Sequence, residues 1–239
     1  MADWLVSRRD KSIVVWENIQ TMLLETLKLE AVKRGLHKPG EEIDVKQAFF
    51  LVRDMPYTRA SSRVSETIIH EWRGTCSGKH YLLKKLFAEL GYRSRLIACT
   101  TVNHIDPKSV SGKLRKLLEQ SNGRFVDVHN YLVLELPEGE MIVDATWPLA
   151  TKEMGLVVNE DFVLGVNHQI ATKPIKTWVV PEDGDSQEFK DRILKESFTP
   201  EELAHREEFI KTLGVMTNSR WIRFLVRLEK LVGGSSGKK

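Results

Sequence analysis

The most informative segment of the chain is WRGTCSGKHYLLKKLFAELG, which occupies residues 72–91. Its apolar positions recur at helical spacing, so we expect a helix from Cys76 to Leu90 that ends at Gly91. The apolar stripe of this helix consists of Tyr81, Leu82, Leu86 and Leu90. Cys76 therefore stands at the start of the helix, where the positive end of the helix dipole stabilises a thiolate.

Cys76 is the candidate nucleophile. Its backbone N–H belongs to the first helical turn and can point at an oxyanion, and Gly74 lets the backbone approach a substrate closely. A free cysteine is more often a small buried hydrophobe, and Cys99, inside an apolar run, is typical of that role. The position at the helix start thus separates Cys76 from Cys99.

A hairpin is expected downstream. Two β-rich runs, residues 125–136 and 141–147, are joined by Pro-Glu-Gly-Glu at 137–140, and proline and glycine between apolar runs indicate a tight turn. Between the cysteine helix and this hairpin, residues 95–102 alternate as a strand and residues 109–120 have a helical pattern.

His129 and Asp144 lie on the two arms of this hairpin. With Pro137 and Glu138 as the turn, Thr146 opposes His129, and Asp144 is its diagonal neighbour on the same face. A one-step change of pairing places His129 and Asp144 directly opposite. Either arrangement lets the carboxylate orient one ring nitrogen while the other faces a nucleophile. Asp144 also lies in an apolar run, where an unpaired carboxylate is costly.

The order of these motifs resembles the transglutaminase-like superfamily of cysteine acyl-transfer enzymes. The resemblance rests on Gly74-Thr75-Cys76 and the leucines after it, on His129 in a strand, and on Val143-Asp144-Ala145-Thr146-Trp147. It covers roughly residues 45–150 and implies an α+β, papain-like core with the cysteine helix on an antiparallel sheet. It also implies that Cys76 is the nucleophile, His129 the general base and then acid, and Asp144 the orienting carboxylate.

The chain departs from the family pattern in two places. His80 stands four residues after the cysteine, where the superfamily often has a small residue, and the helix expected at 109–120 is an insertion. A side-chain oxyanion donor is not assigned, although Tyr57, His70 and Trp72 lie upstream, where related enzymes supply one.

The resemblance implies attack of a thiolate on an amide or peptide carbonyl and a thioester intermediate. Release to water, as in a protease or amidase, is favoured because water is always present. An amine acceptor, as in a protein-glutamine transglutaminase, is an alternative. So is an arylamine N-acetyltransferase-like activity, which the sequence at 73–76 also resembles. A non-catalytic binding module on the same fold is the alternative from outside the enzymes.

The segments outside this core are expected to be mainly helical. We divide the chain into an N-terminal helical segment (1–42), a catalytic core (43–180), C-terminal helices (181–232) and a flexible tail (233–239). The elements not yet named are helices at 11–34, 44–54, 199–213 and 221–231, a strand at 175–180 and a polar loop at 57–65, of which 44–54, 57–65 and 175–180 belong to the core. The helix at 199 opens with a capping box and a proline at the first helical position.

Composition narrows the function classes. Of the 239 residues, 41% are hydrophobic, which suits a packed core, and no apolar run nears the roughly 20 residues of a membrane span. Two cysteines cannot form a disulfide framework, and no secretory signal is evident, so we expect a cytoplasmic protein. The net charge is +3, and the basic residues alternate with apolar ones at helical spacing, which predicts solvated helix faces rather than a nucleic-acid groove.

The remaining histidines show no metal-binding spacing, and there is no glycine-rich phosphate loop, so neither a metal nor another cofactor is expected. The expected partner is a peptide or protein amide substrate, with no membrane or nucleic acid. The oligomeric state is left open.

Overall fold

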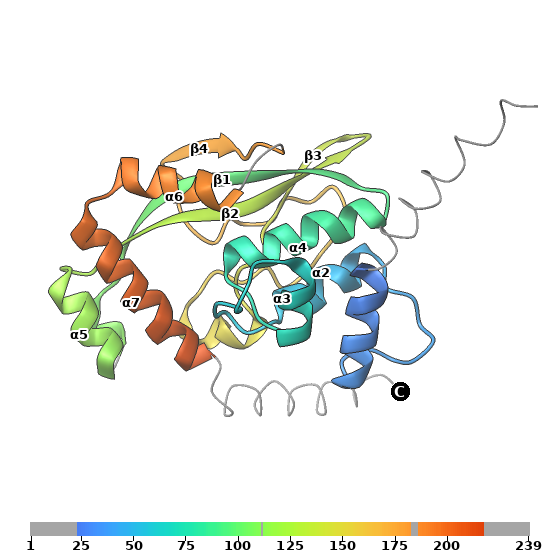
Figure 1. Ribbon diagram of the computed structural model, residues 1–239, viewed down its shortest axis with the longest axis horizontal. Helices are drawn as coiled ribbons and strands as arrows, with labels where there is room; N and C mark the ends of the chain where they lie inside the picture. The colour runs from blue at the N-terminus through green and yellow to red at the C-terminus, as the bar shows by residue number, and fades with distance from the viewer. Residues whose placement is uncertain (1–22, 111, 183–185, 218–239) are drawn as a thin grey trace, which may run out of the picture.

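The computed structural model describes residues 23–110, 112–182 and 186–217. Within them the fold is mixed α+β, with helices arranged around a four-stranded antiparallel sheet of order β3-β2-β1-β4 (Figure 1). The strands are β1 (Arg93–His104), β2 (Arg124–Leu136), β3 (Gly139–Val143) and β4 (Lys176–Val179). The helices are α2 (Val45–Arg53), α3 (Ser65–Glu71), α4 (Cys76–Glu89), α5 (Gly112–Gln120), α6 (Ser186–Ser197) and α7 (Pro200–Thr217), and residues 23–33 are also helical. Short 3-10 helices occupy Pro107–Ser109 and Leu149–Met154.

The predicted hairpin is formed by β2 and β3. Leu136 pairs with Gly139, so Pro137 and Glu138 make the turn, as the sequence predicts. The expected strand at 141–147 is too long, because β3 ends at Val143. Asp144 leaves the ladder there, since its backbone N–H donates to His168 Nδ1 at 3.3 Å.

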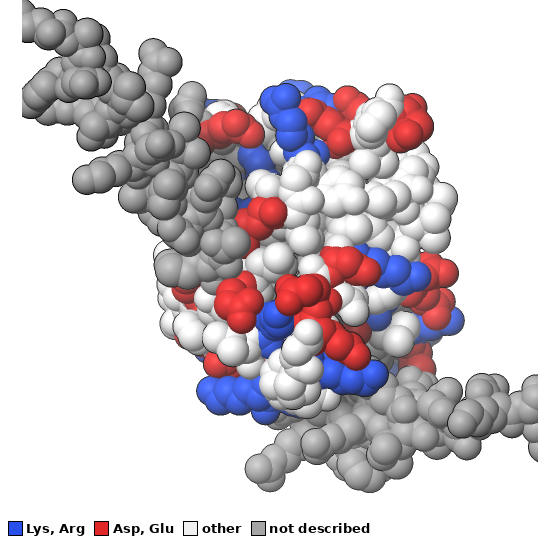
Figure 2. Space-filling view, turned by 90° about the vertical axis from the view of Figure 1, so that its right-hand side faces the viewer, with Lys and Arg blue, Asp and Glu red and all other residues white. Residues whose placement is uncertain are grey.

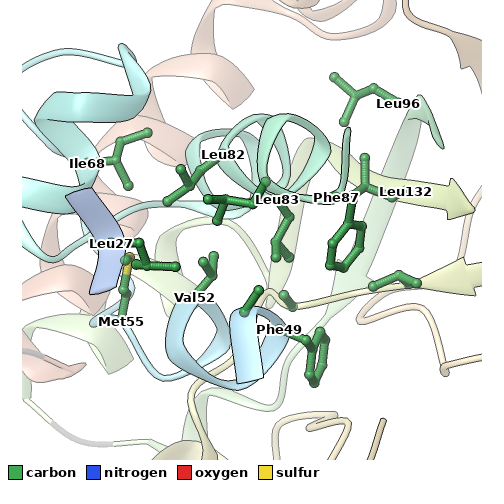
Figure 3. Packing of buried hydrophobic residues seen from close by; sticks show 14 of the residues in the cluster. Leu27, Phe49, Val52, Met55, Ile68, Leu82, Leu83, Phe87, Leu96 and Leu132 are labelled. Atoms are coloured by element: carbon green, nitrogen blue, oxygen red, sulfur yellow. The ribbon is translucent and has the colours of Figure 1, made fainter. Parts of the chain in front are cut away.

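The main core lies between α4, the sheet and α2. Leu82, Leu83 and Phe87 of α4 point toward Phe49 and Val52 of α2, and Leu96 of β1 and Leu132 of β2 flank them (Figure 3). Leu27 from the helix at 23–33 and Ile193 and Leu194 from α6 are buried in the same cluster. The segments predicted as N-terminal and C-terminal helical additions thus share the core of the central segment.

The opposite face of the sheet has a smaller apolar cluster. Ile97 and Cys99 of β1 and Tyr131 and Val133 of β2 lie there, packed against Ile170. Alternate residues of a strand face opposite sides of a sheet, and this accounts for the division of β1 and β2 between the two clusters.

Most other predicted elements agree with the structure. The predicted helices at 44–54, 76–90 and 109–120 correspond to α2, α4 and α5, and the one opening at Thr199 corresponds to α7. The strands expected at 95–102 and 175–180 correspond to β1 and β4. The sequence analysis did not delimit α3 and α6. The predicted helix at 221–231, the tail at 233–239 and the first part of the helix at 11–34 lie outside the described residues.

Figure 2 shows the right-hand side of Figure 1, where acidic and basic side chains are intermixed beside a patch of uncharged ones. Among the described residues, no helix has both the length and the apolar character needed to span a membrane.

Candidate functional site

Cys76 is the first residue of α4, as the sequence predicts. Thr75, the N-cap residue, is extended and makes no side-chain capping bond, so the first-turn amides keep the positive end of the helix dipole beside the thiol. Gly74 has a packing role, because a Cβ on it would lie 3.2 Å from Lys79 Cγ.

His129 and Asp144 meet just beyond the end of the pairing between β2 and β3. The last β2–β3 pair is Leu132 with Val143, and beyond it His129 Nε2 donates to Asp144 Oδ2 at 2.8 Å. Asp144 also accepts the backbone N–H groups of Ala171 at 2.8 Å and Thr146 at 3.0 Å. Burial raises the pKa of the Asp144 carboxyl, but the charge and hydrogen bond of His129 outweigh it and lower that pKa. Asp144 is therefore an ionised carboxylate that orients the imidazole.

His129 is close enough to the Cys76 thiol for each group to shift the pKa of the other. Because Asp144 occupies Nε2, the ring nitrogen left to face the sulfur is Nδ1. Burial raises the pKa of the Cys76 thiol, but Lys190 and His129 lower it to about 6. Burial lowers the pKa of His129, but Asp144 and Cys76 raise it to about 10. These opposite shifts favour a thiolate–imidazolium pair, which is the reactive form of a cysteine nucleophile.

His80 connects the nucleophile helix to the aspartate segment. Its side chain is fully buried. Its Nε2 accepts the backbone N–H of Ala145 at 2.9 Å, so the proton is on Nδ1, which donates to the Cys76 carbonyl at 2.7 Å. Burial lowers the pKa of His80 to about 4 and keeps the ring neutral at physiological pH. The histidine that departs from the family pattern thus links Cys76 to Ala145, the residue that follows Asp144.

Lys79 supports the same segment from the next position of α4. Its ammonium, which is fully buried, donates to the Arg53 carbonyl at 2.7 Å and to the Thr146 carbonyl at 3.0 Å. The end of α2 and the turn after Asp144 are therefore fixed against the same side of α4.

A cationic group that the sequence analysis missed comes from α6. Lys190 Nζ donates to Ser77 Oγ at 2.8 Å and lies 3.9 Å from Cys76 Sγ. Asp127 of β2 lies 3.9 Å from the same ammonium and is bound more closely by Arg206 of α7, at 2.6 Å. The sequence contains a weak signal for it, because Lys190 shares a helix face with Ile193 and Leu194, at i+3 and i+4.

Of the three upstream residues considered as oxyanion donors, only Tyr57 lies at the site. It packs in one cluster with Cys76, and its ring contacts Trp147 at 4.3 Å between centroids. His70 is largely exposed, and its Nδ1 lies 3.7 Å from Glu30. Trp72 is part of the main core, beneath the guanidinium of Arg34.

The site is closed in this conformation. Cys76 is 1% exposed, His129 5% and Asp144 2%. Cys76 shares a buried cluster with apolar side chains from α5 and α7: Leu114, Leu118, Phe209 and Leu213.

Cys99 differs from Cys76 in its backbone position and in the pKa of its thiol, although both are buried. It lies inside β1, where it pairs with His129 of β2. Burial raises the pKa of its thiol to about 12. A thiol of this kind is inert, so the structure distinguishes the two cysteines in the direction that the sequence indicates.

In the described part of the chain, no group of three or more His, Cys, Asp or Glu side chains is arranged to hold a metal ion. Comparisons of the chain with protein-family models, with curated proteins and with solved structures find no significant match.

Proposed function

We propose that this protein is a cysteine-dependent acyl-transfer enzyme on a papain-like, transglutaminase-like core, and that it hydrolyses an amide or peptide bond. The observation that carries the proposal is the linked set of thiol, imidazole and carboxylate. Cys76 begins a helix, His129 acts on its thiol and lowers the pKa of that thiol, and Asp144 Oδ2 accepts a hydrogen bond from His129 Nε2 at 2.8 Å.

In the proposed reaction the Cys76 thiolate attacks the carbonyl carbon, a carbon–sulfur bond forms, and the carbonyl oxygen becomes an oxyanion. The protonated His129 gives its proton to the leaving nitrogen, the amide bond breaks, and a thioester remains on Cys76. Water then attacks the thioester while His129 accepts a proton, and the carboxylic acid leaves as the thiolate is restored. Asp144 stays ionised throughout and stabilises the imidazolium.

The sequence favours hydrolysis over transfer to an amine only because water is always available. A glutamine-directed transglutaminase and an arylamine N-acetyltransferase-like enzyme would use the same three side chains and differ in the acceptor. The product of the reaction therefore decides between them.

The test is an activity screen of the wild-type protein with three substrate sets: peptides, glutamine peptides with an amine acceptor, and acetyl thioesters with arylamines. Cys76→Ala should abolish turnover and leave the fold intact, because the change removes one sulfur at a helix start. His129→Ala should lose nearly as much, since members of such a set act as a unit. Cys99→Ala is the matched control and should remain active. Activity that survives in Cys76→Ala refutes the nucleophile assignment.

One observation favours a second candidate, a non-catalytic binding module. Cys76 is 1% exposed and shares a buried cluster with side chains of α5 and α7. A binding module has no need of a reactive thiol. Alkylation of Cys76 no faster than that of Cys99, together with inactivity across the whole screen, would favour this candidate.

A further inference from the structure

The ammonium group of Lys190 is buried at the start of α4. The residue is 3% exposed, and Nζ has three neighbours: Ser77 Oγ at 2.8 Å, Cys76 Sγ at 3.9 Å and Asp127 Oδ1 at 3.9 Å. Ser77 Oγ donates its own proton to Asn130 Oδ1 at 2.8 Å, so it acts as the acceptor toward Lys190. The ammonium is therefore held in place by neighbours on two elements, α4 and β2.

The ion pairs around this lysine leave it free to act on the sulfur. Asp127 is satisfied mainly by Arg206, whose Nε and Nη2 lie 2.7 and 2.6 Å from Oδ1. Lys190 is 3.9 Å from the same oxygen, too far for a hydrogen bond. Its charge therefore acts on the Asp127 carboxylate, which Arg206 already binds, and on the Cys76 sulfur, which lies at the same distance of 3.9 Å.

From this arrangement we propose that Lys190 is a positioning residue that holds Cys76 as a thiolate, so that helix α6 supplies the second cation of the site. The inference rests on the proposed function for the biological role of Lys190. The property that it concerns, and that can be measured separately, is the charge state of the Cys76 thiol. An opposite charge within about 4–6 Å lowers the pKa of an acid by about 1–3 units, and more so in a buried site. Lys190 and the imidazolium therefore share the stabilisation of the thiolate.

Other groups act on the same thiol, and the test must separate them. They are Tyr57 and Arg63 from the segment between α2 and α3, Lys79 from α4 itself, and Asp127 and His129 from β2. The negative charge of Asp127 opposes thiolate formation, whereas His129 and Lys190 favour it. Each of these groups is unchanged when only Lys190 is replaced.

The experiment measures the alkylation rate of Cys76 by iodoacetamide against pH in the full-length protein, read by peptide mass spectrometry. Lys190→Met should move the midpoint upward by at least about one pH unit, because the charge is lost while most of the unbranched side chain is kept. Lys190→Arg should retain most of the wild-type midpoint. Lys195→Met, which removes an exposed charge from the same helix, is the matched control and should leave the midpoint unchanged.

Lys190→Gln is the second variant if Lys190→Met does not fold, because its amide keeps a donor for Ser77. It should shift the midpoint in the same direction. Adding His129→Ala to Lys190→Met should move the midpoint further, toward that of an ordinary cysteine. A folded Lys190→Met or Lys190→Gln protein with the wild-type midpoint would show that the lysine is structural only, and would overturn the proposal.

These outcomes are independent of turnover. A shifted midpoint in a protein without amide hydrolase activity supports the inference and contradicts the proposed function. Amide hydrolase activity in a protein whose midpoint does not depend on Lys190 supports the proposed function and contradicts the inference about Lys190.

Discussion

Replacement of His80 by glutamine should make the protein less sensitive to acid. The native ring accepts the Ala145 N–H and donates to the Cys76 carbonyl, which requires the neutral form. Burial lowers the pKa of His80 to about 4, whereas an unfolded histidine titrates near the ordinary value of 6.5. As the pH falls from about 6.5 toward about 4, the unfolded chain gains a proton that the folded protein does not bind. The contribution of His80 to stability is therefore present above about pH 6.5 and lost as the pH falls.

The magnitude follows from the two pKa values. Each pH unit between them corresponds to about 1.4 kcal/mol, so the free energy of unfolding should fall by roughly 3 kcal/mol over this interval because of His80 alone. In His80→Gln the side chain cannot titrate, and its amide oxygen still offers an acceptor to Ala145. Near neutral pH the variant should be less stable by about 1–2 kcal/mol, because the hydrogen bond to the Cys76 carbonyl is lost.

The assay is urea unfolding of both proteins at several pH values between about 7 and about 4.5, with the free energy obtained by linear extrapolation. The curves should converge on acidification. His168, whose pKa burial also lowers, and Asp144 contribute equally to both proteins, so they cancel in the difference. His104→Gln, at an exposed end of β1, is the control and should follow the wild-type slope. Parallel curves of unfolding free energy against pH for wild type and His80→Gln would refute the assignment of His80 as a neutral ring in the folded protein.

In the native protein Cys76 should be alkylated faster than Cys99, because their thiol pKa values are about 6 and about 12; equal rates in a peptide mass-spectrometric assay would contradict this. Asp144→Asn should reduce amide turnover on the order of 10³–10⁴-fold, since an amide no longer fixes the productive tautomer of His129, and near-wild-type kcat/KM would exclude the orienting role. Phe209→Ala should speed the labelling of Cys76 without changing the labelling of Cys99 or the pH midpoint of Cys76 labelling. Arg206→Met should raise that pH midpoint. The same midpoint in both variants would contradict this difference.

The sequence predicts the register of the hairpin and the side-chain pair that it brings together. Successive side chains of a strand point to opposite faces of the sheet, and a tight turn at Pro137 and Glu138 allows few registers between the two strands. The contact between His129 and Asp144 therefore follows from local pattern. The end of β3 does not follow in this way. It depends on His168, which is 24 residues further along the chain and takes the backbone N–H of Asp144.

The charge environment of the thiol could not be predicted from local pattern either. Lys190 is 114 residues from Cys76, and the spacing of its apolar neighbours shows that it lies on a buried face but not what it meets there. His80 was visible only as a departure from the family pattern. Its role depends on the path of the backbone at Ala145, which is set by contacts from α4 and from the segment after β3.

The cover and the charge of the site are coupled through Asp127. Phe209 and Arg206 both belong to α7, but they act differently on Cys76. Loss of the Phe209 ring removes apolar cover and leaves the ion pairs in place. Loss of the Arg206 guanidinium leaves the Asp127 carboxylate without its nearest cation, and the carboxylate then competes with the thiolate for Lys190, 3.9 Å from each. A movement of α7 that opens the site and separates Arg206 from Asp127 would therefore destabilise the thiolate form of Cys76. A movement that keeps Arg206 bound to Asp127 would admit a substrate while Cys76 remains a thiolate.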